Sequence, residues 1–214
     1  DISGDKNMID AFKNNQDIHA ITASQVFNMP LDFVTGEMRS RAKAVNFGIV
    51  YGIGAYSLAK DIGVTNKEAK NYIESYLKHY SGIDKYMHDV VEKAKDTGYV
   101  ETVFGRRRYL PELSASNGMT RAFGERVARN APIQGTAADI IKIAMIKVDK
   151  RLTEEKLEAR LVLQVHDELI VECPSHESMR VAMILQEEME KAVSLSVPLV
   201  ADSAVGKTWY DAKG

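Results

Sequence analysis

Helix start and stop signals follow one another along residues 17–98. This series of helix boundaries constrains the fold more than any other feature of the sequence. Asp17 is a suitable N-cap for a helix that continues to about Phe27, and Thr65-Asn-Lys-Glu68 has the residues of a capping box. Glycine or proline follows where the apolar spacing stops. The predicted helices start at Asp17, Thr35, Ala55, Thr65 and Ser81, and their stop signals are Asn28-Met-Pro30, Gly52 with Gly54, Gly63 and Gly98.

From Tyr99 onward the pattern changes to a mixture of strands and helices. Short extended segments are predicted on both sides of a turn at Gly105. Helices are predicted over residues 119–130 and from Thr136, and Pro132 is expected to break or restart the chain between them. A hairpin over residues 160–173, a helix from 175 to about 193 and a final strand over 197–205 complete the pattern. The chain is therefore predicted to be α+β, with a boundary between its halves at residues 114–118.

The composition is that of a globular protein. Of the 214 residues, 45% are hydrophobic and 27% are charged, which excludes a disordered chain. No apolar run reaches the length of about 18 residues that a membrane span needs, and the first residues lack a signal pattern. Cys173, the single cysteine, agrees with a reducing location, so we expect a cytoplasmic protein. The net charge of −2 argues against broad attraction of a polyanion, although local basic clusters permit nucleic-acid binding.

A cationic and aromatic stripe lies on the helix that begins after Thr35. Arg39, Lys43, Phe47 and Tyr51 recur at every fourth residue and fall along one face. Cations neutralise phosphate oxygens, and an aromatic ring offers its face to a base, so the stripe suits a nucleoside triphosphate. The alternative is a solvated basic edge whose two rings are tucked into a core.

The predicted hairpin carries His166, Asp167 and Glu168 at its tip. A hairpin presents its tip rigidly, so these side chains are held at one place. A carboxylate there suits Mg²⁺, which takes few protein oxygens and fills its other positions with water and phosphate. The alternative is an ordinary polar turn.

Further candidate binding residues lie outside these two motifs. The guanidinium groups of Arg106–Arg108 suit several phosphates of one strand, and the alternative is a solvated basic loop. Arg126, Asn130 and Gln134 recur at spacings of four and offer hydrogen bonds to base or sugar edges, unless they are satisfied buried amides. His19, at a helix N-terminus, is placed to donate to a phosphate or is a surface histidine.

These pieces resemble the C-terminal polymerase region of family A DNA polymerases, in order and along essentially the whole chain. The segment from Arg39 to Gly52, Arg-x-x-x-Lys-x-x-x-Phe-Gly-x-x-Tyr-Gly, is similar to motif B, and Val165-His-Asp-Glu168 is similar to motif C. Three further segments agree with the family: Asp17-Ile-His19, Phe104-Gly-Arg-Arg-Arg-Tyr109 and Asn130-Ala-Pro-Ile-Gln134-Gly-Thr-Ala-Ala-Asp139.

The resemblance implies a role for each of these residues in adding dNTPs to a primer on template DNA. It implies two Mg²⁺ ions, with Asp167 as a metal ligand, Glu168 close by and Lys43 also acting in catalysis. It further implies a palm-to-fingers entry over residues 1–16, fingers over 17–117 and part of a palm over 118–214. The implied dNTP-binding residues are His19, Arg39, Lys43, Phe47 and Tyr51, and the implied DNA-binding residues are Arg106, Arg107, Arg108, Arg126, Asn130, Gln134 and His166.

One departure from the family limits this expectation. The resemblance places a second metal-binding aspartate in motif A, before the segment that matches Ser3-Gly4-Asp5, together with the glutamate that excludes ribonucleotides. Residues 1–16 also show apolar spacing at Met8, Ile9 and Phe12 without a start signal. We therefore expect a piece of a longer polymerase that is inactive alone and that self-associates through surfaces left uncovered.

Two other functions compete with this interpretation. A metal phosphohydrolase of the HD type also has a His-Asp pair, but that class places the pair on a helix, whereas β-rich runs flank His166 and Asp167 here. A non-catalytic nucleic-acid or protein-binding module would use the basic clusters for adhesion alone.

Overall fold

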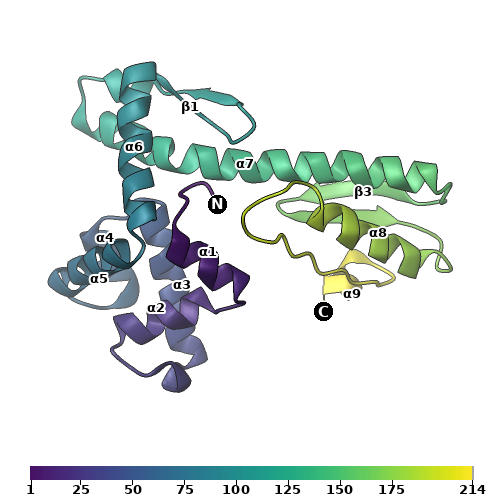
Figure 1. Cartoon of the computed structure of the whole chain (residues 1–214), viewed down its shortest axis with the longest axis horizontal. Coiled ribbons are helices and arrows are strands. Elements are labelled where there is room, and N and C mark those ends of the chain that lie inside the picture. Colours follow the sequence, from purple (N-terminus) through teal and green to yellow (C-terminus); the bar gives the residue numbers. More distant parts are fainter. Residues whose placement is uncertain (214) are drawn as a thin grey trace. The chain divides into compact units, whose positions relative to one another are not determined.

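The structure, a computed structural model, describes residues 1–213. It forms two compact units, residues 1–134 and the part from Gly135 onward, and each is described by itself. The first holds α1 (Lys6–Lys13), α2 (Ile18–Val26), η1 (Leu31–Phe33), α3 (Gly36–Val50), α4 (Ala55–Ile62), α5 (Asn66–His79), α6 (Ser81–Thr97), β1 (Tyr99–Glu101), β2 (Arg107–Tyr109) and η2 (Pro111–Ser114). The second holds β3 (Arg160–Val165), β4 (Glu168–Glu172), α8 (Ser178–Glu190) and α9 (Trp209–Lys213), and α7 (Gly118–Glu154) includes the dividing point (Figure 1).

The predicted α+β class is confirmed, and so are the signals that delimit the helices. Asp17 and Thr35 cap α2 and α3 with their side chains. Thr65 and Glu68 form the reciprocal capping box at the start of α5. Gly63 and Gly98 end α4 and α6 in the left-handed conformation, which glycine adopts without steric cost.

The prediction that residues 1–16 lack a helix start signal is wrong. Asp5 is the N-cap of α1, and its Oδ1 accepts from the backbone N–H of Met8 at 2.8 Å. Its Oδ2 accepts from the backbone N–H of Gly82, in α6, at the same distance. The carboxylate is buried, with 4% of the residue exposed, so it ties the first helix to the sixth.

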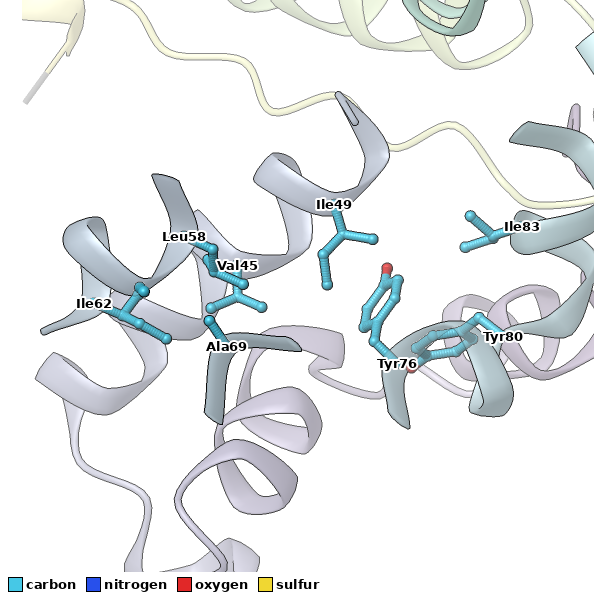
Figure 2. Packing of buried hydrophobic residues seen from close by; sticks show 9 residues of the cluster. Val45, Ile49, Leu58, Ile62, Ala69, Tyr76, Tyr80 and Ile83 are labelled. Atoms are coloured by element: carbon cyan, nitrogen blue, oxygen red, sulfur yellow. The ribbon is translucent and has the colours of Figure 1, made fainter. Parts of the chain in front are cut away.

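The largest apolar cluster of the first unit lies among α3, α4, α5 and α6. Figure 2 shows Val45 and Ile49 of α3 together with Leu58 of α4 and Tyr76 of α5 in this cluster. Tyr76 and Tyr80 pack with ring centroids 4.8 Å apart. Burial of one face of α3 leaves its opposite face to solvent, so this core sets the orientation of the helix.

A second cluster fixes the hairpin of β1 and β2. The strands pair antiparallel, with Val100 opposite Arg108 and Glu101 opposite Arg107. Val100 and Leu110 are buried with Ala128 of α7, whereas the β2 side chains are exposed. The extended segments predicted around Gly105 are confirmed.

The predicted break at Pro132 is wrong, because α7 continues through it as one helix (Figure 1). Pro132 removes one backbone hydrogen bond and normally kinks or breaks a helix. Here the buried positions Ala128, Pro132 and Thr136 follow at helical spacing, so burial on both sides of the proline favours continuation. Thr136 is a buried residue within the helix rather than an N-cap.

The second unit is a hairpin packed with helices. β3 and β4 pair antiparallel, as predicted, with an irregularity between Leu161 and Leu163. Val148 and Leu152 of α7 form a core with Val181 and Ile184 of α8. Arg151 contributes polar contacts beside it, because Nη1 donates to Glu187 and Glu188, each at 2.7 Å, and Nε donates to Glu155 at 3.0 Å.

The final strand predicted over residues 197–205 is wrong. The segment is without strand pairing in the part of the chain that the structure describes, although Val197, Leu199 and Ala201 alternate in burial with their neighbours. Alternation reports an extended backbone, but a strand also needs a partner. The backbone N–H of Ala201 donates instead to the Glu190 carboxylate at 3.3 Å.

Two further predictions concern boundaries and membranes. The compact units divide between Gln134 and Gly135, while the proposed fingers and palm limits at 16/17 and 117/118 remain predictions. Among residues 1–213, no helix combines the length and the apolar character needed to cross a membrane.

Candidate functional site

The exposed face of α3 carries the stripe that the sequence predicts. Ala42, Val45, Asn46 and Ile49 are buried on one side of α3, whereas Arg39, Lys43 and Phe47 are exposed on the other. Phe47 is 45% exposed and Tyr51 is 38% exposed. The alternative that these two rings lie in a core is therefore wrong.

Aromatic contacts order this face. The rings of Phe47 and Tyr51 stack, with centroids 6.2 Å apart and planes inclined by 21°. The ring centroid of His19, from α2, lies 5.9 Å from that of Phe47. Lys43 Nζ also lies 5.9 Å from the centroid of the Phe47 ring. The cations Arg39 and Lys43 are thus followed, along the same face of α3, by the exposed rings of Phe47 and Tyr51.

Asp17 links the two helices that carry these groups. Its Oδ1 accepts from the backbone N–H groups of His19 and Ala20, at 3.0 and 3.1 Å, which caps α2. Its Oδ2 accepts from Arg39 Nε at 2.5 Å. Burial alone would raise the pKa of Asp17, but the hydrogen bonds from Arg39 and Ala20 outweigh it and lower the pKa, so the carboxylate is ionised at neutral pH.

Asn46 makes a second link between α2 and α3. Its Nδ2 donates to Nδ1 of His19 at 2.8 Å, and the amide is buried. An accepting Nδ1 leaves the imidazole proton on Nε2. Burial lowers the pKa of His19, the charge of Asp17 opposes this, and the charges of Arg39 and Lys43 lower the pKa further, so the ring is neutral at pH 7 and offers one N–H donor.

Gly52 brings the end of α3 against α7. Its φ of 75° lies in the left-handed region, and a Cβ placed there would lie 3.4 Å from Nη1 of Arg129 and 3.9 Å from Cγ of Arg126. Arg126, Asn130 and Gln134 follow along the uninterrupted helix at spacings of four. Oδ1 of Asn130 is buried and has no hydrogen-bond partner among residues 1–213, so this amide is not the fully satisfied one of the alternative interpretation.

The arginines of the β1–β2 hairpin are exposed, but they are not equivalent. Nε of Arg107 donates to Glu101 at 2.8 Å, and its guanidinium lies 4.5 Å from the centroid of the Tyr99 ring. Arg107 is therefore held within the hairpin, whereas Arg108 is exposed on the neighbouring position of β2. The prediction that Arg106–Arg108 bind several phosphates of one strand stays a prediction.

The second unit presents His166 and Asp167 at the turn between β3 and β4. His166 has a φ of 52°, and its carbonyl accepts from Nε2 of Gln164 at 2.6 Å. Asp167 is exposed, whereas Oε2 of Glu168 is buried and has no hydrogen-bond partner within the described part of the chain. The His-Asp pair lies in a hairpin and not on a helix, which contradicts the HD phosphohydrolase interpretation.

The two carboxylates at this turn fit a hydrated cation better than a protein-enclosed one. Among residues 1–213, no group of three or more His, Cys, Asp or Glu side chains is placed to hold a metal ion. Mg²⁺ is commonly held by one or two carboxylates with water and phosphate oxygens. Exposed Asp167 and the unpartnered oxygen of Glu168 suit that mode, while Glu168 Oε1 lies 3.3 Å from Nζ of Lys213.

The structure thus gathers the predicted dNTP-binding residues in one place, on α2 and α3 of the first unit. The hairpin residues lie in the second unit. The sequence indicated Asp17 as a helix cap and as part of the Asp17-Ile-His19 segment, but it indicated no link from Asp17 to Arg39 and did not single out Asn46. A polar residue between Val45 and Phe47, on the turn that faces α2, was the one available signal for Asn46.

Comparison with known proteins decides the family. The profile of DNA polymerase family A matches residues 1–211. The chain belongs to this family. It is 53% identical over 212 residues to the DNA polymerase I of Bacillus subtilis (strain 168) and 52% identical over 212 residues to that of Bacillus caldotenax. Each alignment covers 99% of this chain and 24% of the relative, so the chain spans about a quarter of these polymerases.

A solved structure of the family agrees with the fold. The POL domain of Pol1 from M. smegmatis, in complex with DNA primer-template and dNTP, matches with a TM-score of 0.94 and 44% sequence identity. The match covers 100% of this chain and 38% of that one. The predicted family and fold class are therefore confirmed.

Proposed function

We propose that this chain supplies the dNTP-binding face and one metal-binding carboxylate of a DNA-directed DNA polymerase. The observation that carries the proposal is the exposed stripe of Arg39, Lys43 and Phe47 on α3, with the neutral His19 ring beside it. The solved relative in complex with primer-template and dNTP supports these partners for a chain of the same family.

The stripe matches the parts of a nucleoside triphosphate in order. Arg39 and Lys43 carry positive charge toward the N-terminal end of α3 and bind phosphate oxygens. His19 donates an N–H to the same phosphates. Phe47 packs on sugar and base, and Tyr51, stacked on Phe47 at the helix end, adjoins the templating position.

The second unit supplies the metal-binding part of the proposal. Asp167 would hold magnesium at the turn, with Glu168 adjacent. Bound Mg²⁺ would stabilise the charge that develops on the transferring phosphoryl group. His166 contacts the primer end. Template and primer are contacted by Arg126, Asn130 and Gln134. The duplex backbone is held by Arg106 to Arg108. Residues 17–117 are the fingers and 118–214 part of the palm.

A chimeric polymerase tests this function. In it, the 214 residues replace the matching segment of the Bacillus subtilis relative, to which they are 53% identical. We expect Asp167→Asn to lower the primer-extension rate by about 10²-fold or more, because one preorganised stabiliser of transition-state charge is lost. Asp149→Asn, an exposed aspartate of α7, is the matched control. Equal rates for both variants would contradict the role of Asp167.

The 214 residues alone are proposed to lack polymerase activity. The family mechanism uses two aspartates to hold two ions, and the motif A aspartate is not among these residues. Large apolar side chains such as Ile146, Met179 and Val200 are 69–76% exposed, which favours self-association. Primer extension at an ordinary rate by the chain alone, or a monomer at all concentrations in sedimentation, would contradict these two expectations respectively.

A further inference from the structure

One carboxylate, that of Asp17, serves both helices of the dNTP-binding face. Oδ1 is used by the backbone of α2, at His19 and Ala20, and Oδ2 is used by Arg39 of α3. The side chains of Arg39 and Asp17 are 49% and 42% exposed, so the pair is accessible to a ligand. Capping of α2 uses only Oδ1. The bond that Oδ2 accepts from Arg39 is therefore not explained by helix capping.

The contact to Arg39 is made through Nε. Neither terminal nitrogen of Arg39 has a hydrogen-bond partner among residues 1–213. A guanidinium carries its other four N–H groups on Nη1 and Nη2. A pairing through Nε therefore restrains the Arg39 side chain and leaves its two terminal nitrogens available to bind a phosphate group in a bidentate manner.

A neighbouring ion pair on the same helix is made differently. Glu37 accepts from Nη2 of Arg41 at 2.8 Å, four residues along α3. That contact occupies a terminal nitrogen and belongs to one helix. Arg39 and Arg41 thus pair differently: Arg39 uses Nε to join two helices, whereas Arg41 uses a terminal nitrogen within one helix.

We infer that Asp17 is a positioning residue for nucleotide binding: it holds Arg39 by Nε so that both terminal nitrogens face the triphosphate. The same carboxylate caps α2 and so places His19 beside Arg39. The inference rests on the proposed function, since it names how one of the proposed phosphate ligands is oriented. An opposite role, in which Asp17 competes with phosphate for Arg39, predicts the opposite sign in the test.

Asp17→Asn in the chimeric polymerase separates the tether from the cap. Asparagine caps helices about as well as aspartate but lacks the charge that binds Arg39. We expect the KM for dNTP to rise roughly threefold to fivefold, the range for loss of an exposed ion pair, while kcat changes less than about twofold. Asp17→Ser, which also caps, is expected to give the same result. An unchanged or lower KM in both variants would overturn the inference.

Glu37→Gln is the matched control, because it removes the same charge from an ion pair near Arg39 without touching Nε. Its KM is expected to stay within about twofold of the unmodified chimera. A rise equal to that of Asp17→Asn would show a general charge effect and would overturn the inference.

A double variant separates this inference from the proposed function. If Asp17 acts through Arg39, then Asp17→Asn adds nothing to the KM of Arg39→Ala. If Arg39→Ala itself leaves the KM unchanged, the proposed function fails at Arg39. If Arg39→Ala raises the KM but the Asp17 variants do not, only the inference fails.

An NMR measurement on the 214-residue chain tests the bond itself. The Nε–H proton of Arg39 should exchange faster with water in Asp17→Asn, and unchanged exchange would count against the bond from Arg39 to Asp17.

Discussion

The buried amide of Asn46 donates to Nδ1 of His19 at 2.8 Å and thereby fixes which nitrogen of the imidazole carries the proton. With Nδ1 as the acceptor, the proton of the neutral ring is assigned to Nε2. We predict that ¹⁵N NMR of the chain at pH 7.5 shows His19 as the Nε2–H tautomer. Asn46→Leu, which removes the donor, should give a mixture of tautomers, whereas His88, on α6, should be unaffected. A dominant Nδ1–H form in the unmodified chain would contradict the assignment.

The pKa of His19 is predicted to lie below its ordinary value of about 6.5. Burial is the first cause; the charge of Asp17 acts in the opposite direction, and the charges of Arg39 and Lys43 lower the pKa further. Lys43→Ala should therefore raise the pKa in an NMR titration, and Lys60→Ala, on α4, should not. Since the folded state favours neutral imidazole, the His19 contribution lowers stability as pH falls from about 6.5 towards the depressed value. A pKa above 6.5 would contradict this prediction.

Phe47→Tyr tests the placement of Phe47 against the sugar. In the chimeric polymerase the added hydroxyl can replace the contact that a dideoxynucleotide lacks, so discrimination against dideoxynucleotides should fall by about tenfold or more. Phe33→Tyr, at a phenylalanine 69% exposed on η1, is the control and should leave discrimination unchanged. Equal discrimination in both variants would remove the assigned role.

Gly82→Ala tests the tie between α1 and α6. A Cβ at Gly82 would lie 2.8 Å from the Cα of Asp5, a backbone atom, so we expect a loss of about 1–3 kcal/mol in the free energy of unfolding. Gly36→Ala, at the start of α3, meets no atom within 4 Å and should be neutral or slightly stabilising. Urea denaturation of the chain measures both, and a stabilising Gly82→Ala would contradict the close approach.

Local signals made most helix boundaries predictable. The caps at Asp17, Thr35 and Thr65 act within a few residues, so the sequence contains all that decides them. The stripe on α3 was predictable for the same reason, because its spacing depends on helix geometry alone. The turn at His166 followed from the strands that flank it.

The errors of sequence reasoning have two different causes. Burial on both sides of Pro132 keeps α7 continuous, and that burial has no local signature. The cap at Asp5 is local, because its bond to Met8 spans three residues, so the signal was present in the sequence and was missed; only the bond to Gly82 joins distant elements. The links from Asp17 to Arg39 and from Asn46 to His19 also join residues more than twenty positions apart, so spacing did not predict them.

The most direct test of the central claim is the KM for dNTP of Lys43→Ala in the chimeric polymerase. Loss of a charge-assisted contact to phosphate should raise the KM by about tenfold or more. Arg41→Ala, at an exposed cation of the same helix that pairs with Glu37, should stay within about twofold of the unmodified chimera. Equal KM values for the two variants would contradict the claim that α3 binds the nucleotide and would favour a module that uses its basic clusters for adhesion alone.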